Sequence, residues 1–117
     1  SRQYSADGAG LMLVPAWDFI TDGWLHSRMA ILRGVESGFS IARTAKQGTM
    51  TVTDSRGRIL AEQSSAAQPG SATAPFSILI ASAPVWHQPT VYAWAGNWFA
   101  WFDLILAAAL IASIKTN

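Results

Sequence analysis

Hydrophobic positions in the first third of the chain predict a strand followed by a helix. The continuous apolar run at residues 11–14 predicts a strand over residues 10–16 that is buried on both faces. Asp22 suits the N-cap of a helix, because beyond it the apolar residues recur at roughly helical spacing, at Leu25, Met29, Leu32 and Val35. Gly38 is well placed as the C-terminal cap that ends this helix.

From Phe39 onward the period of the pattern changes to two. Ile41, Arg43 and Ala45 would share one side of a strand that follows the helix. Threonines alternate with apolar residues over residues 49–53, polar turn residues follow at 54–57, and apolar residues resume at Ile59 and Leu60. This pattern predicts a β-hairpin over residues 49–60. Residues 63–75, rich in Ser, Ala, Gly and Pro, predict a surface loop, and residues 76–82 predict a last strand.

This order of elements predicts an α/β fold in which a helix covers one face of a sheet and leaves the other face for something else to cover. Residues 90–114 form a different segment, because they carry a single charge, Asp103, and begin with a cluster of aromatic residues. The length and the aromatic cluster predict a C-terminal transmembrane helix from about Trp98 to Ile114. A buried core helix of a soluble protein is the alternative. The predicted domains are therefore residues 1–89 and residues 90–117.

Charge and composition restrict both the molecules that the chain could bind and the kinds of site that it could contain. Only 13% of the 117 residues are charged, and thirteen of the fifteen charged residues precede Gln63. The net charge is +1 with scattered basic residues, which argues against a nucleic-acid partner. The chain has no cysteine, so it contains neither a disulfide nor a cysteine nucleophile, and its two histidines lie too far apart in sequence to predict a metal site.

A cluster of ionisable residues surrounds the junction between the predicted helix and the next strand. Arg33 and Glu36 are i,i+3 neighbours that could pair on the helix surface. Arg43 shares one side of its predicted strand with apolar residues, and that strand is expected to be central in the sheet. Its guanidinium would then be buried and would need a carboxylate partner such as Glu36. Lys46, at the end of that strand, suits either a site residue or a solvated lysine.

Residues 26–60 resemble the carbon-nitrogen hydrolase (nitrilase) superfamily, and specifically its apolipoprotein N-acyltransferases. The residues that match in order and spacing are Arg33, Glu36, Gly38, Arg43, Gly48, Asp54 and Gly57. The motif YAWAGNW, residues 92–98, is similar to the Y-x-x-x-G-N-W that leads into the last transmembrane helix of those acyltransferases. The resemblance covers about residues 10–110.

The resemblance implies a membrane enzyme that transfers an acyl chain from phospholipid to the N-terminal amine of apolipoproteins through a cysteine thioester. The catalytic Glu, Lys and Cys of that family would lie upstream of this chain, so the chain alone is predicted to be inactive and to need no cofactor. It would supply the C-terminal part of an α-β-β-α sandwich, with the missing N-terminal portion of the fold as a partner. The expected location is the inner membrane of a bacterium, with the globular part facing the periplasm.

Candidate site residues follow from these placements. Trp17, Asp18 and Phe19 come after a strand's carboxyl end, which predicts a substrate-binding, acyl-facing wall; packing of the aromatic residues against Trp24 is the alternative. The predicted structural support of the site consists of His26, Arg33, Glu36 and Arg43.

The chain also departs from the family at two places that bear on substrate specificity. It has PAWDF where the family often has S-N-D, and Lys46 and Gln47 where the family has the asparagine of a turn. Two other functions therefore stay open. One is a non-catalytic membrane-anchored binding or assembly module, and the other is a carbon-nitrogen hydrolase that acts on small amides.

Overall fold

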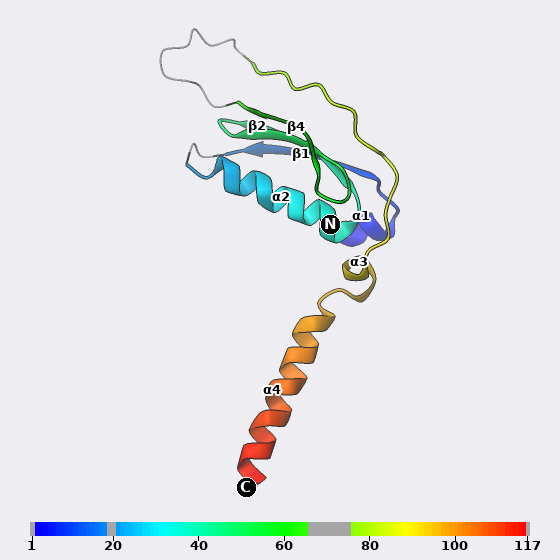
Figure 1. Cartoon of the computed structure of the whole chain (residues 1–117), viewed down its shortest axis with the longest axis vertical. Helices are drawn as coiled ribbons and strands as arrows, with labels where there is room; N and C mark the ends of the chain where they lie inside the picture. Colours follow the sequence, from blue (N-terminus) through cyan, green and yellow to red (C-terminus); the bar gives the residue numbers. More distant parts are fainter. Residues whose placement is uncertain (1, 19–20, 66–75, 117) are drawn as a thin grey trace.

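The fold is mixed α/β, as the order of predicted elements indicates (Figure 1). The structure is a computed structural model, and it describes residues 2–18, 21–65 and 76–116. Its elements are α1 (Arg2–Ala6), β1 (Leu11–Trp17), α2 (Gly23–Ser37), β2 (Ser40–Lys46), β3 (Thr49–Thr53), β4 (Ile59–Ser64), α3 (Val91–Ala95) and α4 (Trp98–Thr116).

The four strands form one sheet in the order β1-β2-β3-β4. β1 and β2 are parallel, with Leu11 opposite Ser40 and Trp17 opposite Lys46, and α2 makes the connection between them. β2, β3 and β4 are antiparallel, which confirms the predicted hairpin. β4 extends to Ser64, so it includes the first residues of the predicted loop; residues 66–75 of that loop lie outside the described residues.

β1 is confirmed as a strand, but the prediction that both its faces are buried is wrong. β1 lies at the edge of the sheet, and the side chains of Leu13 and Trp17 are each 70% exposed on the face opposite α2. Pro15 sits within the strand, opposite Thr44. An edge strand tolerates proline because it has one side on which no ladder hydrogen bond is needed.

α2 is confirmed with its left-handed C-cap at Gly38 (φ 76°), yet its apolar stripe faces away from the sheet. The buried positions of the helix are small residues: Gly23, Ser27, Gly34 and Ser37. A Cβ atom on Gly34 would lie 2.7 Å from Ile41 Cγ1, and Ser27 Oγ lies 2.7 Å from Thr51 Oγ1. Small side chains therefore let the helix backbone lie close to the sheet.

The larger apolar side chains of α2 are exposed as a consequence of this close packing. We call them the outer face of α2, which consists of Trp24, Leu25, Met29, Leu32 and Val35. Among the described residues, the buried hydrophobic side chains lie elsewhere, and they are Phe39, Ile41, Ala45 and Met50. The buried apolar core is thus small and is centred on β2.

The other face of the sheet, which we call the open face, carries no helix among the described residues. Residues 76–90 run over it, on the side opposite α2 (Figure 1). Ser40 Oγ donates a hydrogen bond to Pro84 O at 2.6 Å, and residues 77–79 line a small cavity with the sheet residues Ala42, Met50 and Val52. The predicted strand at residues 76–82 is wrong. The segment crosses a face of the sheet and does not lie along an edge, so its backbone has no neighbouring strand with which to form hydrogen bonds.

α3 is fastened to the C-terminal end of α2. Thr90 Oγ1 accepts a hydrogen bond from Ala93 N at 3.1 Å and donates one to Glu36 O at 2.5 Å. Gln88 N donates to Gly38 O at 2.8 Å. These bonds fix the place from which α4 leaves the globular part (Figure 1).

The helix predicted at residues 98–114 is confirmed as α4, and its side chains up to Ile114 are exposed. The predicted membrane span is not found. Within residues 2–18, 21–65 and 76–116, no helix combines the length and the apolar character that crossing a bilayer requires.

The close approach of α2 to the sheet gives the first prediction. Gly34→Ala places a methyl group against Ile41 Cγ1 and Phe39 O, so we expect a loss of about 1–3 kcal/mol in the free energy of unfolding. Leu32→Ala, on the outer face of α2, serves as the control and should cost less than about 1 kcal/mol. Urea unfolding of the full chain in mild detergent measures both, and equal losses would contradict the packing described above.

Candidate functional site

A buried cluster of polar contacts surrounds Asp18, the residue that follows β1. Its side chain is 2% exposed and that of Arg43 is 3% exposed. Arg43 Nη2 donates to Asp18 Oδ1 at 2.5 Å, and Arg43 Nη1 donates to Thr49 O at 2.7 Å. Asp18 N also donates to Lys46 O at 3.0 Å. One guanidinium therefore joins the adjacent ends of three strands, β1, β2 and β3.

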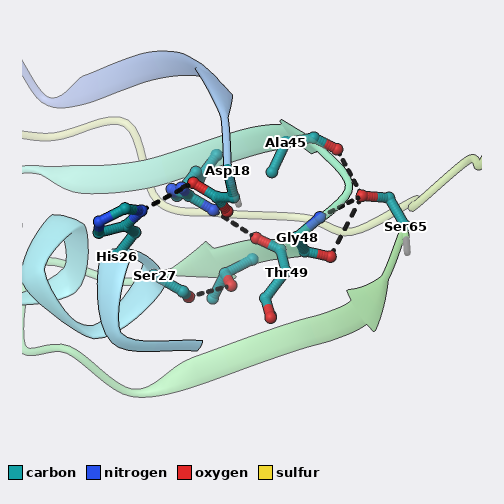
Figure 2. Close-up of polar contacts among 9 residues, drawn as sticks. Asp18, His26, Ser27, Ala45, Gly48, Thr49 and Ser65 are labelled. Atoms are coloured by element: carbon teal, nitrogen blue, oxygen red, sulfur yellow. Dashed lines mark hydrogen bonds and ion pairs between the residues drawn. The ribbon is translucent and has the colours of Figure 1, made fainter. Parts of the chain in front are cut away.

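His26 adds a second donor to the same carboxylate oxygen. Its Nδ1 atom lies 3.2 Å from Asp18 Oδ1, and Figure 2 shows the ring reaching from α2 toward Asp18. Because an ionised carboxylate only accepts hydrogen bonds, Nδ1 is the donor in this contact. His26 is 40% exposed, so it forms the solvent-facing side of the cluster.

Two glycines make room for the carboxylate. A Cβ atom on Gly48 would clash with Asp18 Oδ2, and a Cβ atom on Gly23 would lie 2.9 Å from Gly48 Cα. Asp18 Oδ2 is buried without a hydrogen-bond partner among the described residues. The second carboxylate oxygen is thus held by backbone packing, which explains why a side chain at position 48 is not tolerated.

Ser65 closes the turn between β2 and β3 on which Gly48 lies. Ser65 Oγ is 2.5 Å from Ala45 O and 3.1 Å from Gly48 O, and it accepts from Gly48 N at 3.1 Å (Figure 2). The turn includes Gln47 at φ 59°, a left-handed conformation that costs energy in a residue other than glycine. The role of Ser65 was not predicted, because the residue lies in a stretch whose composition is typical of a loop and carries no signal for this contact.

The electrostatics of Asp18 make it a permanent anion at neutral pH. Burial by itself raises the pKa of the carboxyl group, but the hydrogen bond and charge of Arg43, together with those of His26, outweigh burial and lower the pKa. A carboxyl group that stays ionised does not donate protons near neutral pH. Its role is to hold the guanidinium and the imidazole in place.

The structure corrects the predicted partner of Arg43. Arg43 is buried as expected, but Asp18 and not Glu36 neutralises it. Glu36 pairs with Arg33 at 2.9 Å on the surface of α2, which is the i,i+3 contact that the sequence suggests. The parallel register puts Val14 opposite Arg43 and Trp17 opposite Lys46, so the residue just after β1 comes within reach of the guanidinium.

Two residues of the predicted acyl-facing wall, Trp17 and Asp18, lie on opposite sides of the sheet, and the wall itself stays a prediction. Trp17 lies on the open face, with Lys46 Nζ 4.4 Å from its ring centroid. Asp18 is buried on the side of the sheet that α2 covers. Phe19 lies outside the described residues. Trp24 stacks on Arg28, whose Cζ atom is 5.2 Å from its ring centroid.

The arrangement can position groups, but the chain holds no cysteine to act as a nucleophile. Within the described ranges, no group of three or more His, Cys, Asp or Glu residues could hold a metal ion. Of the predicted supporting residues, His26 and Arg43 meet at Asp18, whereas Arg33 and Glu36 pair with each other on the surface of α2. The site is therefore an organised edge of the sheet that could support chemistry carried by other residues.

The two arginine–carboxylate pairs allow a matched test of stability. Arg43→Met leaves Asp18 as an unpaired buried anion, and we expect a loss of about 3–5 kcal/mol in the free energy of unfolding. Arg33→Met removes the exposed pair and should cost less than about 1 kcal/mol. Denaturant unfolding measures both variants, and similar small losses would contradict the burial of the Asp18–Arg43 pair.

The lowered pKa of Asp18 predicts how stability depends on pH. Because the folded-state pKa lies below the ordinary value of 3.8, the unfolded chain binds the proton first as the pH falls. The contribution of Asp18 is complete above about pH 4 and is lost as the pH falls through the folded-state pKa.

The measurement is the free energy of unfolding between about pH 6 and about pH 2. Asp18→Asn should remove the part of the decrease in unfolding free energy at low pH that the protonation of Asp18 causes. Asp54 gives the control. Burial raises the pKa of its carboxyl group, but hydrogen bonds from Arg58 and Arg56 outweigh burial and lower the pKa. Asp54→Asn should therefore remove a separate part of the stability that is lost in acid. An unchanged acid profile in Asp18→Asn would contradict the prediction.

Comparison with known proteins gives no assignment for this arrangement. No protein-family model, no curated protein and no solved structure matches the chain.

Proposed function

We propose that this chain is the C-terminal portion of a membrane-bound N-acyltransferase of the carbon-nitrogen hydrolase kind. The enzyme would move an acyl chain from phospholipid to the N-terminal amine of apolipoproteins through a cysteine thioester, and the catalytic Glu, Lys and Cys would lie outside this chain. The observation that carries the proposal is the buried Asp18–Arg43 pair with His26 at the carboxyl edge of β1 and β2. Ligands of α/β proteins bind beyond this edge of a sheet.

The residues behind the resemblance support the proposal, because several have a demanding structural role. Gly38 and Gly57 adopt left-handed conformations, with φ 76° and φ 79°. Asp54 Oδ1 accepts hydrogen bonds from Arg56 N and Arg58 N, both at 2.9 Å, and so closes the turn between β3 and β4. Gly48 makes room for Asp18 Oδ2. The motif therefore specifies this helix, turn and strand arrangement.

The open face supports the proposal that a further layer completes an α-β-β-α sandwich. Leu13 and Trp17 are exposed on that face, and residues 76–90 alone run over it among the described residues. A sheet with one helix-covered face and one apolar face buries the second face against another layer. The partner we propose is the N-terminal portion of the same fold, which would also bring the catalytic residues.

α4 supports attachment to a membrane. Between Trp98 and Ile114 its side chains are exposed and Asp103 is the one charged residue. Aromatic residues gather at its beginning, where it leaves the globular part: Trp98, Phe99, Trp101 and Phe102. Aromatic side chains favour the headgroup region of a bilayer. Contact with lipid would place the globular part next to its phospholipid donor, and the resemblance favours the periplasmic side of the bacterial inner membrane.

The chemistry that we propose divides between this chain and the residues outside it. A thiolate would take the acyl group from the phospholipid and pass it to the amine of the acceptor, which is covalent catalysis and needs no cofactor. The side chains of this chain would hold the site in its geometry and would not themselves react. Arg43 and Asp18 hold the ends of β1, β2 and β3 in register, so the edge that borders the acyl site stays rigid.

The test is an acyl-transfer assay on the native polypeptide purified from membranes of the source cell, with a labelled phospholipid and a diacylglyceryl-cysteine peptide. We expect transfer by that polypeptide and none by residues 1–117 alone. Arg43→Lys keeps the positive charge, but a single ammonium group cannot reproduce the two guanidinium donors that reach Asp18 and Thr49 O. Acyl transfer should therefore fall at least about tenfold. Arg33→Lys is the matched control and should keep the wild-type rate.

Circular dichroism must show that both variants are folded. Transfer by residues 1–117 alone would refute the proposed division of the catalytic residues. A native polypeptide that contains no cysteine and transfers no acyl group would favour the anchored binding module. Hydrolysis of small amides without acyl transfer would favour the hydrolase.

A further inference from the structure

The outer face of α2 is an apolar surface that the fold leaves uncovered. Trp24, Leu25, Met29 and Leu32 are each more than half exposed, while the opposite side of the helix is buried through glycines and serines. A surface helix of a globular protein normally turns its apolar side chains to the core. α2 does the reverse, so its larger side chains are available to another apolar partner.

The two arginines of α2 beside this face are paired with carboxylates. Arg28 forms two hydrogen bonds with the carboxylate of Glu62, at 2.7 and 3.0 Å, and its guanidinium also lies over the ring of Trp24. Arg33 is paired with Glu36. The ionisable side chains within α2 are thus paired, and the exposed Asp22 lies at the N-cap, at one end of the face. The surface therefore suits an apolar medium, with a tryptophan and arginine at its border as at a headgroup boundary.

The direction of α4 indicates which medium covers this face. Figure 1 shows α2 on the side of the sheet toward which α4 projects, with the axis of α2 running across that of α4. The hydrogen bonds from Thr90 and Gln88 to the end of α2 hold the base of α4 near that helix. A surface that α4 enters would therefore contact α2 as well, with the axis of α2 lying along that surface.

Lipid fits both apolar surfaces better than a second copy of the chain does. α4 carries apolar side chains around its circumference, with Asp103 as the one charged residue from Trp98 to Ile114. A protein surface that covers one side would therefore leave apolar side chains on the other sides in water. A lipid layer covers all sides of α4 at once. The same layer would cover the outer face of α2, as it covers helices that lie in the plane of a membrane interface.

We propose that the outer face of α2 rests on the lipid surface that α4 enters, so the chain contacts the membrane at two places. This inference rests on the membrane attachment in the proposed function, but not on acyl transfer. It sets the orientation of the sheet, because the open face then points away from the lipid and stays free for the second layer of the sandwich.

The absence of cysteine allows a direct test by single-site labelling of the full chain. Met29→Cys, Leu13→Cys and Ile105→Cys are each labelled with the fluorophore NBD and mixed with phosphatidylcholine vesicles that contain spin-labelled acyl chains. Met29 and Leu13 form a matched pair, because both are exposed apolar residues but they lie on opposite sides of the sheet. Ile105 reports on α4.

We expect strong lipid quenching at positions 29 and 105 and little at position 13. Quenching at 105 without quenching at 29 overturns the role of α2 while membrane attachment stands. No quenching at any position overturns attachment itself. Shielding of position 29 that rises with protein concentration in the absence of lipid would assign the outer face of α2 to a second copy.

Binding measurements give a second readout with matched variants. Met29→Glu should weaken vesicle binding at least threefold, since it puts a charge into the proposed contact, whereas Leu13→Glu should leave binding unchanged. Equal effects of the two variants, or no effect of either, would overturn the proposal. Acyl transfer is measured separately, so failure of the enzymatic proposal remains distinguishable from failure of the lipid contact.

Discussion

The buried pair of Asp18 and Arg43 constrains most of what surrounds it. A guanidinium inside a sheet is tolerated only if its donors are occupied, and here they reach a carboxylate and a backbone carbonyl on neighbouring strands. The carboxylate in turn needs space, which requires glycine at position 48. Replacement of such pairs by apolar residues is often neutral, so the pair is better explained by the geometry that it imposes than by net stability. That geometry is the alignment of three strand ends at the edge where we place the acyl site.

Periodicity in the sequence located the elements but not the faces that they bury. The helical spacing of Leu25, Met29 and Leu32 identified α2, although those side chains point outward. The inner face could not be predicted in this way, because Gly34 and Ser27 carry almost no hydrophobic signal and their contribution is the close approach that they allow. The same limit applies to β1, where an apolar run does not distinguish a central strand from an edge strand whose second face awaits a partner.

Contacts between distant residues were harder to predict than elements. The sequence indicated that Arg43 needs a carboxylate, but the choice of Asp18 over Glu36 depends on the parallel register of β1 and β2. Ser65 and the segment at residues 76–90 likewise acquire their roles only from the folded arrangement. The alternating pattern of residues 76–82 is typical of a strand, yet a strand also needs an edge with free backbone groups, and this segment lies over a face.

Three apolar surfaces of this chain are exposed together: the outer face of α2, the open face of the sheet and α4. Apolar surface left in water forgoes about 25 cal/mol per Å², and the buried apolar core around Phe39 and Ile41 is small by comparison. Covering only one surface would leave the other two in water, so the folded chain is best stabilised when all three are covered. The surfaces also point in different directions, since the open face lies opposite α2 and α4 projects on the side of α2. The second protein layer and the lipid surface that we propose would cover different sides of the sheet, so they would not compete for the same surface.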